Sequence, residues 1–456
     1  MSAIITDPFK KQFMQKIFDE VTNLDARYYI GIGKNDQWNA TETVPTPIDS
    51  PKSIRDAQNA LQSVKAVAST SFVIPRYNWS NGDIYSGYDD EYSTIPSNSY
   101  YVLTEDNHVY ICLQQSKSGT GEANKSTVKP TGTSPKPFKT TDGYTWRFLY
   151  ALSAFDTSAF LSANFIPVKF VDSANDTFET QQKTAQDSAD AGRILNIVVE
   201  NRGSGYTGTP TVTITGNRGA IGDSAQATAT VLNEQIVKID MLNESAGSGK
   251  NFVNATVTIS GGGGSGATAR AVLGPPNGIG ADPRDDLKAT SLMFNSKPDG
   301  AENGDFLAGN DQDFRQVMLI RNPRTDSANG TILTATTARA LRYLQVDSAF
   351  GSQLAVDELI TNSLTPPAKA YVDEAINFDT SSMKVYYHQT DSTGYTPFSI
   401  GNTLTDEGGQ TGTIAVVADS NELYINTSGE VLYIENRAPV VRSLSQTEDI
   451  KVVVTL

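Results

Sequence analysis

The clearest helical pattern lies near the N-terminus. Asp7 followed by Pro8 is typical of a helix cap and first turn. Apolar residues then recur every three to four positions, which predicts an amphipathic helix near residues 8–22. The residues that carry this spacing are Phe9, Phe13, Ile17 and Val21. Few other segments of the chain show it.

Short β-branched and aromatic runs, separated by Gly, Pro, Asn and Asp, predict strands through the first part of the chain. These runs are 28–32, 71–74, 100–103, 108–113, 144–152 and 166–171. Polar stretches at 40–52 and 114–142 predict long surface loops. Further along, 313–323 and 450–456 read as strands, and a short helix is expected at 336–346 or 368–376.

An internal repeat covers about 193–273. ILNIVVENRGSGY, TVTITG and AQATATVL in the first copy are answered by IVKIDMLNESAGSGK, TVTISG and GATARAVL in the second. Each copy alternates small and β-branched residues between Gly-rich turns. TAQDSADAGR at 184–193 and GPPNGIGADPRDD at 274–286 read as linkers, so we expect a compact β module inserted between them.

We therefore predict a mainly β chain with minor α content, built from several antiparallel β-sandwich or barrel-like domains. Two β modules are inserted into a host domain that both chain ends form. The expected ranges are a first host part at 1–185, the repeat module at 190–275, a host continuation at 286–384, a small inserted module at 385–430 and closing strands at 431–456.

Charge and composition narrow the possible functions. The 456 residues hold 36 Lys plus Arg and 51 Asp plus Glu, a net charge of −15 that disfavours nucleic-acid binding. Cys112, His108 and His388 are too few for a Cys/His zinc site within one chain, and a single cysteine excludes an internal disulfide. No signal peptide or membrane-spanning run is evident, so we expect assembly in a cytoplasm and no membrane insertion.

No motif predicts a catalytic or cofactor site. GGGGSG at 261–266 precedes a β-like run, and GSGK at 247–250 and GTGEANKS at 119–126 lack the spacing of a phosphate loop, so all three read as turns or loops. No nucleophile elbow surrounds a serine, and His108 and His388 read as ordinary packing or surface residues. Asp89, Asp90 and Glu91 could in principle form a glycosidase carboxylate pair, but a sequence does not show how far apart carboxylates lie in space, and we do not favour this role.

Acidic residues gather before and within the strand predicted at 313–323. Asp299, Glu302, Asp305, Asp311 and Asp313 could offer oxygen ligands to calcium, but their spacing differs from the twelve-residue calcium loop. We interpret this stretch as a solvated acidic loop, and whether it binds calcium stays open.

DGYTWRFLYAL at 142–152 places aromatic residues at every second position. Such a face could cover the core of its own sheet, contact a partner protein or stack on a sugar. We favour the first interpretation because a sheet face more often packs against its own core.

Five segments resemble the baseplate wedge subunit family, gene product eight, of T-even-like contractile-tailed bacteriophages. They are IGIGKNDQW (30–38), VIPRYNW (73–79), DGYTWRFLYAL (142–152), DFRQVMLIRNP (313–323) and YIENRAPVVRSLSQTEDIKVVVTL (433–456), and their order also matches. In the last segment, Asn436, Arg437 and Pro439 are expected to form a turn between two strands. The repeat and the 385–430 stretch have no counterpart in this resemblance. The residues that carry the resemblance are Trp38, Pro75, Arg76, Trp79, Gly143, Tyr144, Trp146, Phe314, Arg315, Asn322, Pro323, Glu435, Asn436, Arg437 and Pro439.

The resemblance implies a non-enzymatic structural subunit of the virion, without cofactor or metal. It would act as a homodimer that joins other wedge proteins and holds the baseplate geometry before sheath contraction. Two alternatives remain. One is a tail adhesin that binds host glycans through the Gly-rich repeat. The other is a glycan-cleaving tail enzyme, which only scattered carboxylates favour. We expect no host-glycan binding under the structural role.

Overall fold

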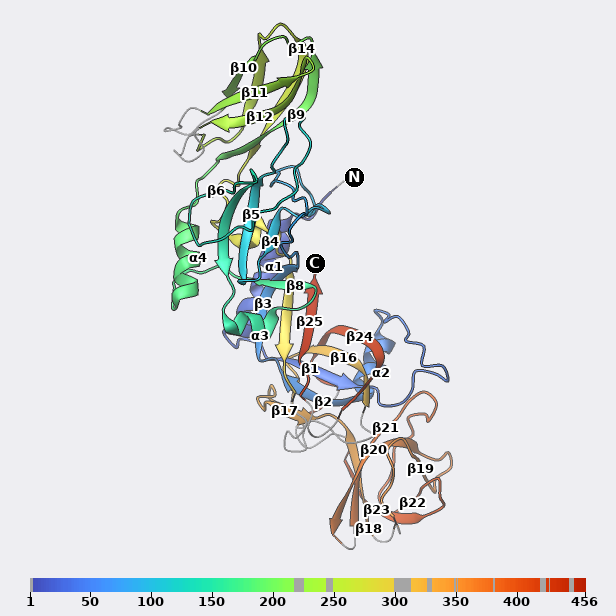
Figure 1. The fold of residues 1–456 in the computed structure, drawn as a ribbon. Coiled ribbons are helices and arrows are strands. Elements are labelled where there is room, and N and C mark those ends of the chain that lie inside the picture. Colours follow the sequence, from blue (N-terminus) through green and yellow to red (C-terminus); the bar gives the residue numbers. More distant parts are fainter. Residues whose placement is uncertain are drawn as a thin grey trace. The chain divides into compact units, whose positions relative to one another are not determined.

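A computed structural model describes residues 3–216, 225–242, 249–298, 313–325, 330–347, 350, 352–379, 382–418, 424–425, 427–442 and 447–456. The chain is mainly β with few helices, and its sheets are antiparallel, which confirms the predicted fold class (Figure 1). It divides into two compact units, each built from separate stretches of sequence. Unit 1 takes residues 1–14, 71–291 and 455–456, and unit 2 takes 15–70 and 292–454.

Unit 1 contains a four-stranded sheet with the order β4-β5-β7-β6. Its strands are β4 (Tyr101–Leu103), β5 (His108–Gln114), β7 (Thr145–Ala151) and β6 (Phe138–Lys139). Helix α4 (Thr177–Asp187) packs against β7, helix α3 (Ala154–Phe160) packs on β8 (Phe165–Val168), and β8 pairs with β3 (Ser69–Pro75). A short helix α5 (Pro283–Asp286) lies near the end of the unit.

Strand β7 is buried along its whole length. Trp146 stacks with Tyr144 and meets the edge of Tyr85, while Phe148 contacts the edge of Tyr110. The aromatic residues of 142–152 therefore form the core of their own sheet, as the favoured interpretation predicted, and offer no exposed face to a partner or a sugar.

The internal repeat forms a closed β-barrel within unit 1, drawn in green in Figure 1. The first copy supplies β9 (Ile194–Ser204), β10 (Thr211–Thr215) and β11 (Gln226–Leu232), and the second supplies β12 (Gln235–Leu242), β13 (Thr256–Ser260) and β14 (Ser265–Leu273). The barrel order is β10-β11-β12-β9-β14-β13. The equivalent strands β10 and β13 pair directly, so the two copies meet at TVTIT and TVTIS.

The first four residues of the GGGGSG segment, 261–264, connect β13 to β14 as a turn, in agreement with the sequence interpretation, and Ser265 and Gly266 begin β14. Gly261, Gly262 and Gly263 all have positive φ, a conformation that glycine adopts without a steric penalty. Gly264 instead faces the ring of Tyr206, and a Cβ at Gly264 would lie 2.5 Å from the ring atom Cγ. Close packing, as well as turn geometry, therefore selects glycine here.

Unit 2 contains a five-stranded sheet with the order β17-β2-β1-β16-β24. Its strands are β17 (Thr337–Arg339), β2 (Leu61–Ala66), β1 (Tyr28–Gly33), β16 (Asp313–Arg321) and β24 (Glu430–Val441). Helix α2 (Pro51–Asn59) contributes to the core on one face of this sheet, together with side chains of β1, β2, β16 and β17. Strands β15 (Ser291–Ser296) and β25 (Ile450–Thr455) are neighbours in a second sheet.

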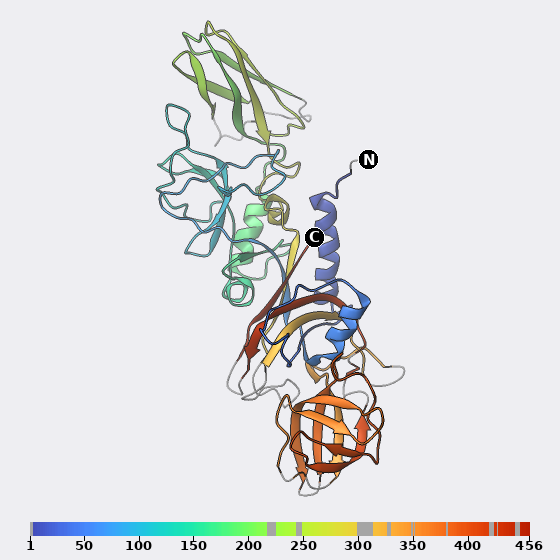
Figure 2. The same ribbon diagram turned by 90° about the vertical axis from the view of Figure 1, so that its right-hand side faces the viewer.

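A second closed barrel belongs to unit 2, and Figure 2 shows its strands, in orange, wrapping around a common axis. They are β18 (Arg342–Asp347), β19 (Leu359–Asn362), β20 (Lys369–Asp379), β21 (Ser382–His388), β22 (Thr403–Thr405) and β23 (Thr411–Ala418). The predicted 385–430 module therefore overlaps strands of a barrel that already begins at β18. The domain ranges as a whole stay predictions.

The short helix expected at 336–346 or 368–376 is wrong, because both stretches form strands. Ala368, just before β20, and Ala370 and Val372 within it are buried at every second position and pack in the core of the barrel. Alanine is a good helix former, but the alternation of burial decides for a strand when neighbouring strands are available to pair.

Helix α1 (Asp7–Thr22) confirms the helix predicted near 8–22. Each strand expected along the chain is present, at β1, β3, β4, β5, β7, β8, β16 and β25. The sequence interpretation missed α2, α3 and α4, although each begins at a recognisable cap. The caps are Ser50 before Pro51, Ser153 with Asp156, and Asp176 with Glu179.

Candidate functional site

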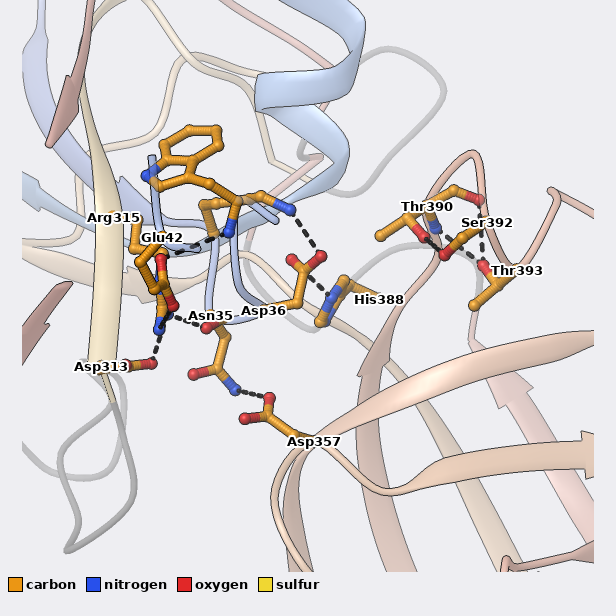
Figure 3. Close-up of polar contacts among 12 residues, drawn as sticks. Asn35, Asp36, Glu42, Asp313, Arg315, Asp357, His388, Thr390, Ser392 and Thr393 are labelled. Carbon is orange, nitrogen blue, oxygen red and sulfur yellow. Dashed lines mark hydrogen bonds and ion pairs between the residues drawn. The ribbon is translucent and has the colours of Figure 1, made fainter. Parts of the chain in front are cut away.

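A cluster of charged side chains lies in unit 2, where the segment after β1 meets β16 and the second barrel (Figure 3). Lys34 begins this segment with a positive φ, and its backbone N–H donates to the carbonyl oxygen of Ala60. Asn39 then accepts backbone N–H bonds from Thr41 and Thr43, which curls the segment into a compact loop. The loop thereby directs Asn35 and Asp36 toward the barrel.

His388, the last residue of β21, lies buried between two carboxylates. Its Nδ1 is 2.8 Å from Oδ2 of Asp373, and its Nε2 is 3.4 Å from Oδ1 of Asp36. Burial by itself would lower the pKa of His388, but the two carboxylates outweigh burial and raise this pKa to about 10. The imidazole is therefore a cation at neutral pH.

Asp36 is the partner that the loop supplies. Burial would raise its pKa, whereas His388 and the ammonium of Lys34, 2.5 Å away, lower it to about 2. Asp36, His388 and Asp373 thus form a chain of alternating charges that joins the loop to the barrel.

Arg315 of β16 is the second centre of the cluster, and only 5% of its surface is exposed. Its guanidinium bonds the carboxylate of Glu42, with Nη2 2.8 Å from Oε1, and that of Asp313 at 2.9 Å. The same group donates to the backbone carbonyl of Asn35. Asn35 in turn donates from Nδ2 to Oδ1 of Asp357 at 2.9 Å, so the barrel is linked to this centre too.

Asp357 shows that negative charge is in excess here. Burial first, and then the neighbouring Asp313 and Asp373, raise the pKa of Asp357 to about 6. His388 lowers this pKa, but its effect is smaller. Protonation of Asp357 in mild acid would therefore relieve repulsion within the cluster.

The geometry of the cluster favours a structural role over proton transfer to a substrate. Hydroxyl groups stand on the neighbouring loop, but Thr390 bonds Ser392 and Thr393, and both ring nitrogens of His388 face carboxylates. A histidine that activates a nucleophile needs one nitrogen directed at that hydroxyl. What this arrangement can do is hold the loop, β16 and the barrel in one geometry.

A cleft of about 500 Å³ opens beside the cluster. Its lining combines apolar groups with amide, hydroxyl and charged side chains, the last being Lys34, Asp36, Asp56 and Asp391. Among the lining residues are Trp38, Pro45, Ile48, Gln316, Tyr395 and Asn436.

Three of the five signature segments meet at this place. The indole N–H of Trp38 donates to the carbonyl oxygen of Arg437 at 2.9 Å. Asn436 accepts from Nε2 of Gln316 at 2.8 Å and donates to the carbonyl oxygen of Pro45 at 2.9 Å. Segments 30–38, 313–323 and 433–456 are therefore joined by direct hydrogen bonds.

The other signature residues of unit 2 lie close to these strands. Phe314 is buried on β16. Asn322 directly follows β16 and has a positive φ; its side-chain oxygen accepts from the backbone N–H of Arg27, and its own N–H donates to the carbonyl oxygen of Arg27. The carbonyl oxygen of Pro323 accepts from the N–H of Leu333, and Glu435 accepts from the hydroxyl of Tyr433. These contacts fix the ends and the margin of the sheet.

The turn predicted at Asn436, Arg437 and Pro439 is wrong, because all three lie inside β24. A register shift in the pairing with β16, between Phe314 and Gln316, accommodates them. Proline lacks a donor and is tolerated at the margin of a sheet, especially beside a bulge. The Asn-Arg-Ala-Pro pattern therefore marks an irregular edge strand.

The remaining signature residues belong to unit 1. The carbonyl oxygen of Pro75 accepts from the hydroxyl of Tyr101, and Arg76 donates to the carbonyl oxygen of Ser162. The indole of Trp79 donates to Oγ of Ser126 at 3.1 Å. Gly143 turns with a φ of 92° ahead of the buried Tyr144 and Trp146. All of these contacts hold loops onto the core of the unit.

The carboxylates at 89–91 surround an arginine. Nη2 of Arg270 lies 2.5 Å from Oδ2 of Asp89, and the same guanidinium also reaches Asp90 and Glu91. These carboxylates therefore attach a loop of unit 1 to strand β14. No described Asp, Glu, His or Cys side chains form a group of three that could hold a metal ion.

Other predictions fall beyond the described part of the chain. Asp299, Glu302, Asp305 and Asp311 lie outside the described residues, and GSGK is described only from Gly249 onward. GTGEANKS at 119–126 lies in a loop, as predicted. His108 is partly buried against Phe148, which agrees with a packing role.

A second cleft, of about 340 Å³, lies in unit 1 beside α5. Asp286 lines it and is buried, with Oδ2 accepting from the N–H of Gly280 at 2.6 Å. Burial is the main cause that raises the pKa of Asp286 to about 8, although Gly280 and Arg147 act in the opposite direction. This carboxyl group is therefore largely protonated at neutral pH.

Sequence reasoning missed the central residues of the cluster in unit 2: Asn35, Asp36, Glu42, Asp357 and Asp373. Asp36 and His388 stand far apart in the sequence, and no spacing rule connects them. The one usable signal was a histidine at the end of an apolar strand, a position where burial without a partner would be costly.

The described helices include none that is both long and apolar enough to span a membrane. No protein-family model matches this sequence, and no curated protein matches it either.

Proposed function

We propose that this protein is a structural subunit of a phage tail baseplate wedge. It would join neighbouring wedge proteins as a homodimer in the virion and hold the baseplate geometry before the sheath contracts. The proposal includes neither catalysis nor a cofactor. It starts from the resemblance of five segments to the gene product eight family.

The observation that carries the proposal is the meeting of three signature segments in unit 2. Trp38 donates a hydrogen bond to Arg437, and Gln316 donates one to Asn436. Residues of three separate sequence segments are therefore direct hydrogen-bond partners. The contacts support the resemblance as a likeness of one three-dimensional unit.

The buried charge cluster suits a subunit that must keep its shape. Removing one partner of a buried ion pair leaves an uncompensated charge, so such a cluster tolerates few alternative arrangements. Here the cluster links the loop after β1, strand β16 and the second barrel. Partner proteins that bind unit 2 would therefore meet a surface with a fixed geometry.

The test is the position of the chain in intact phage tails. We expect cryo-electron microscopy of purified tails to show it in the end plate, as a dimer in each unit of the sixfold ring. Its density at a fibre tip, or its absence from tails, would contradict the proposal. Sedimentation of the purified chain should also give a dimer, and a stable monomer that ignores wedge proteins would count against it.

The adhesin alternative keeps one observation in its favour. The outer faces of β10 and β13 carry two paired rows of exposed hydroxyl side chains. The rows are Thr211, Thr213 and Thr215 on β10, and Ser260, Thr258 and Thr256 on β13. A neutral array of hydroxyls could bind the hydroxyl groups of a glycan.

Thr–Thr pairs also stabilise strands without any ligand, so the array alone does not decide between the two roles. Binding of the full chain to host-surface polysaccharide separates them. The adhesin role requires that Thr213→Val with Thr258→Val weakens binding, whereas the structural role requires no binding at millimolar polysaccharide.

A further inference from the structure

Strand β24 forms the margin of the five-stranded sheet in unit 2. Among the described residues it has one neighbouring strand, β16, and no other described backbone group bonds the backbone of Glu430–Glu435. No residue of β24 is fully buried, whereas most of β16 is. The strand nevertheless carries Val431, Leu432, Tyr433 and Ile434 in succession.

The two halves of this margin differ. In the C-terminal half, the carbonyl oxygen of Arg437 already accepts a hydrogen bond from the indole N–H of Trp38, and Pro439 has no backbone N–H that could donate to another strand. Proline, bulges and covering loops are the usual means by which proteins block the edge of a sheet. Over Glu430–Glu435 no proline and no covering loop is present among the described residues. The one irregularity is a register shift against β16, which leaves Leu432 without a partner on β16 and 41% exposed.

The charges at the open half indicate what it would accept. Glu430 and Glu435 flank the apolar run, and Glu435 has no ion-pair partner among the described residues. Glu430 reaches Arg321 at 3.4 Å but stays largely exposed. If a second copy of the strand paired antiparallel over the same residues, Glu430 of each copy would lie opposite Glu435 of the other. Like charges directly opposite each other destabilise a strand pair, so such self-pairing is disfavoured.

We propose that the open edge of β24, over Glu430–Glu435, docks an extended segment of a different protein as an additional strand. That segment has a β-branched centre and carries lysine or arginine toward its ends. Main-chain hydrogen bonds supply the affinity, and the two glutamates select the charge. The inference rests on the proposed function only in taking the partner to be another protein of the assembly.

A synthetic peptide tests the inference directly. The probe is six residues long, with a lysine at each end and alternating valine and threonine between them, and carries a fluorophore. Anisotropy with the full chain should show saturable binding. Two control peptides should bind at least about tenfold more weakly: one with glutamate at both ends, and one with N-methyl groups on alternate backbone nitrogens.

Charge reversal on the protein provides the matched test. Glu430→Lys combined with Glu435→Lys should weaken binding of the lysine peptide about tenfold, because two attractions become repulsions. Glu234→Lys combined with Glu407→Lys makes the same change in net charge at exposed positions elsewhere and should leave binding unchanged. Unchanged circular dichroism in both variants confirms that they fold.

Three results would overturn the inference. They are equal binding of the N-methylated peptide, no response to charge reversal at β24, and self-association of the chain through this strand. The proposed function fails on a different result, the absence of the chain from the end plate. A wild-type chain that is found in the end plate but shows no saturable binding of the lysine peptide would overturn the edge inference alone.

Discussion

His388 shows how one buried residue depends on partners from distant parts of the chain. Its Nδ1 faces Asp373 on the same barrel, while Asp36 comes from the loop after β1. Because the pKa of His388 is raised from 6.5 to about 10, the folded state holds a proton that the unfolded state loses. This stabilisation is complete below pH 6.5 and is lost as the pH rises through about 10.

We expect His388→Gln to lower the free energy of unfolding of unit 2 by about 3–5 kcal/mol at pH 7, since the fully buried carboxylate of Asp373 loses the cation that lies 2.8 Å away, whereas Asp36 keeps Lys34. The difference from the wild type should shrink as the pH rises through about 10. Denaturant unfolding at a series of pH values measures both effects.

His108→Gln is the matched control. His108 is only partly buried, and burial lowers its pKa, so this substitution should produce no such loss between pH 7 and 10. A wild-type difference for His388→Gln that stays constant up to pH 11 would contradict the assigned charge state.

Asp286 represents the opposite case, a buried acid that costs stability. Burial raises its pKa from 3.8 to about 8, so between these values the folded state holds a proton that the unfolded state has released. The stability of unit 1 therefore falls as the pH rises from about 4 to 8.

Asp286→Asn cannot titrate and keeps an oxygen for the N–H of Gly280. We expect it to stabilise unit 1 at pH 7 by on the order of 2 kcal/mol, with a gain that disappears near pH 4. Asp285→Asn on the same helix is the exposed control. Thermal melts at pH 4 and pH 7 provide the measurement, and an equal gain at both pH values would refute the explanation.

At the scale of elements, the first barrel depends on close contacts at its glycine turns. A Cβ at Gly264 would lie 2.5 Å from Cγ of Tyr206 and 2.6 Å from the carbonyl oxygen of Ser204. Neither the ring nor the backbone can withdraw without disturbing β9 and β14, which are paired here.

Gly264→Ala should therefore destabilise unit 1 by about 2–3 kcal/mol. Gly208→Ala in the same barrel meets nothing within 4 Å and should change stability by less than about 1 kcal/mol. Chemical denaturation followed by tyrosine fluorescence compares the two variants, and equal effects would show that crowding at Tyr206 is not the cause.

The strands were largely predictable because the alternation of residues is a local property. β7 was recognisable from the alternation of Tyr144, Trp146 and Phe148. The two copies of the repeat, which form one barrel, were recognisable by comparing their sequences. Helix α4 was missed because its sequence, TFETQQKTAQD, is polar and its cap at Asp176 received no weight. The turn expected at Asn436 failed because a sheet margin tolerates proline and bulges.

At the scale of the whole molecule, the division into two units predicts how the chain unfolds. Each unit has its own buried clusters and draws on segments from distant parts of the sequence. Compact units with separate cores commonly unfold as separate cooperative transitions.

Calorimetry of the full chain should therefore resolve more than one transition. Gly264→Ala should lower the temperature of one transition, and His388→Gln that of another. A single transition that both substitutions shift equally would show that the two units unfold as one.

The sequence by itself determined the strand-rich character, the repeat that closes the first barrel, and the glycines and aromatic residues that define turns and core. These features depend on residues that are near one another in the chain. Only the tertiary structure decided that Asp36 meets His388, that Trp38 bonds Arg437, and that Glu430–Glu435 lies at a margin. Such pairings depend on how distant strands align, and local periodicity carries no information about that alignment.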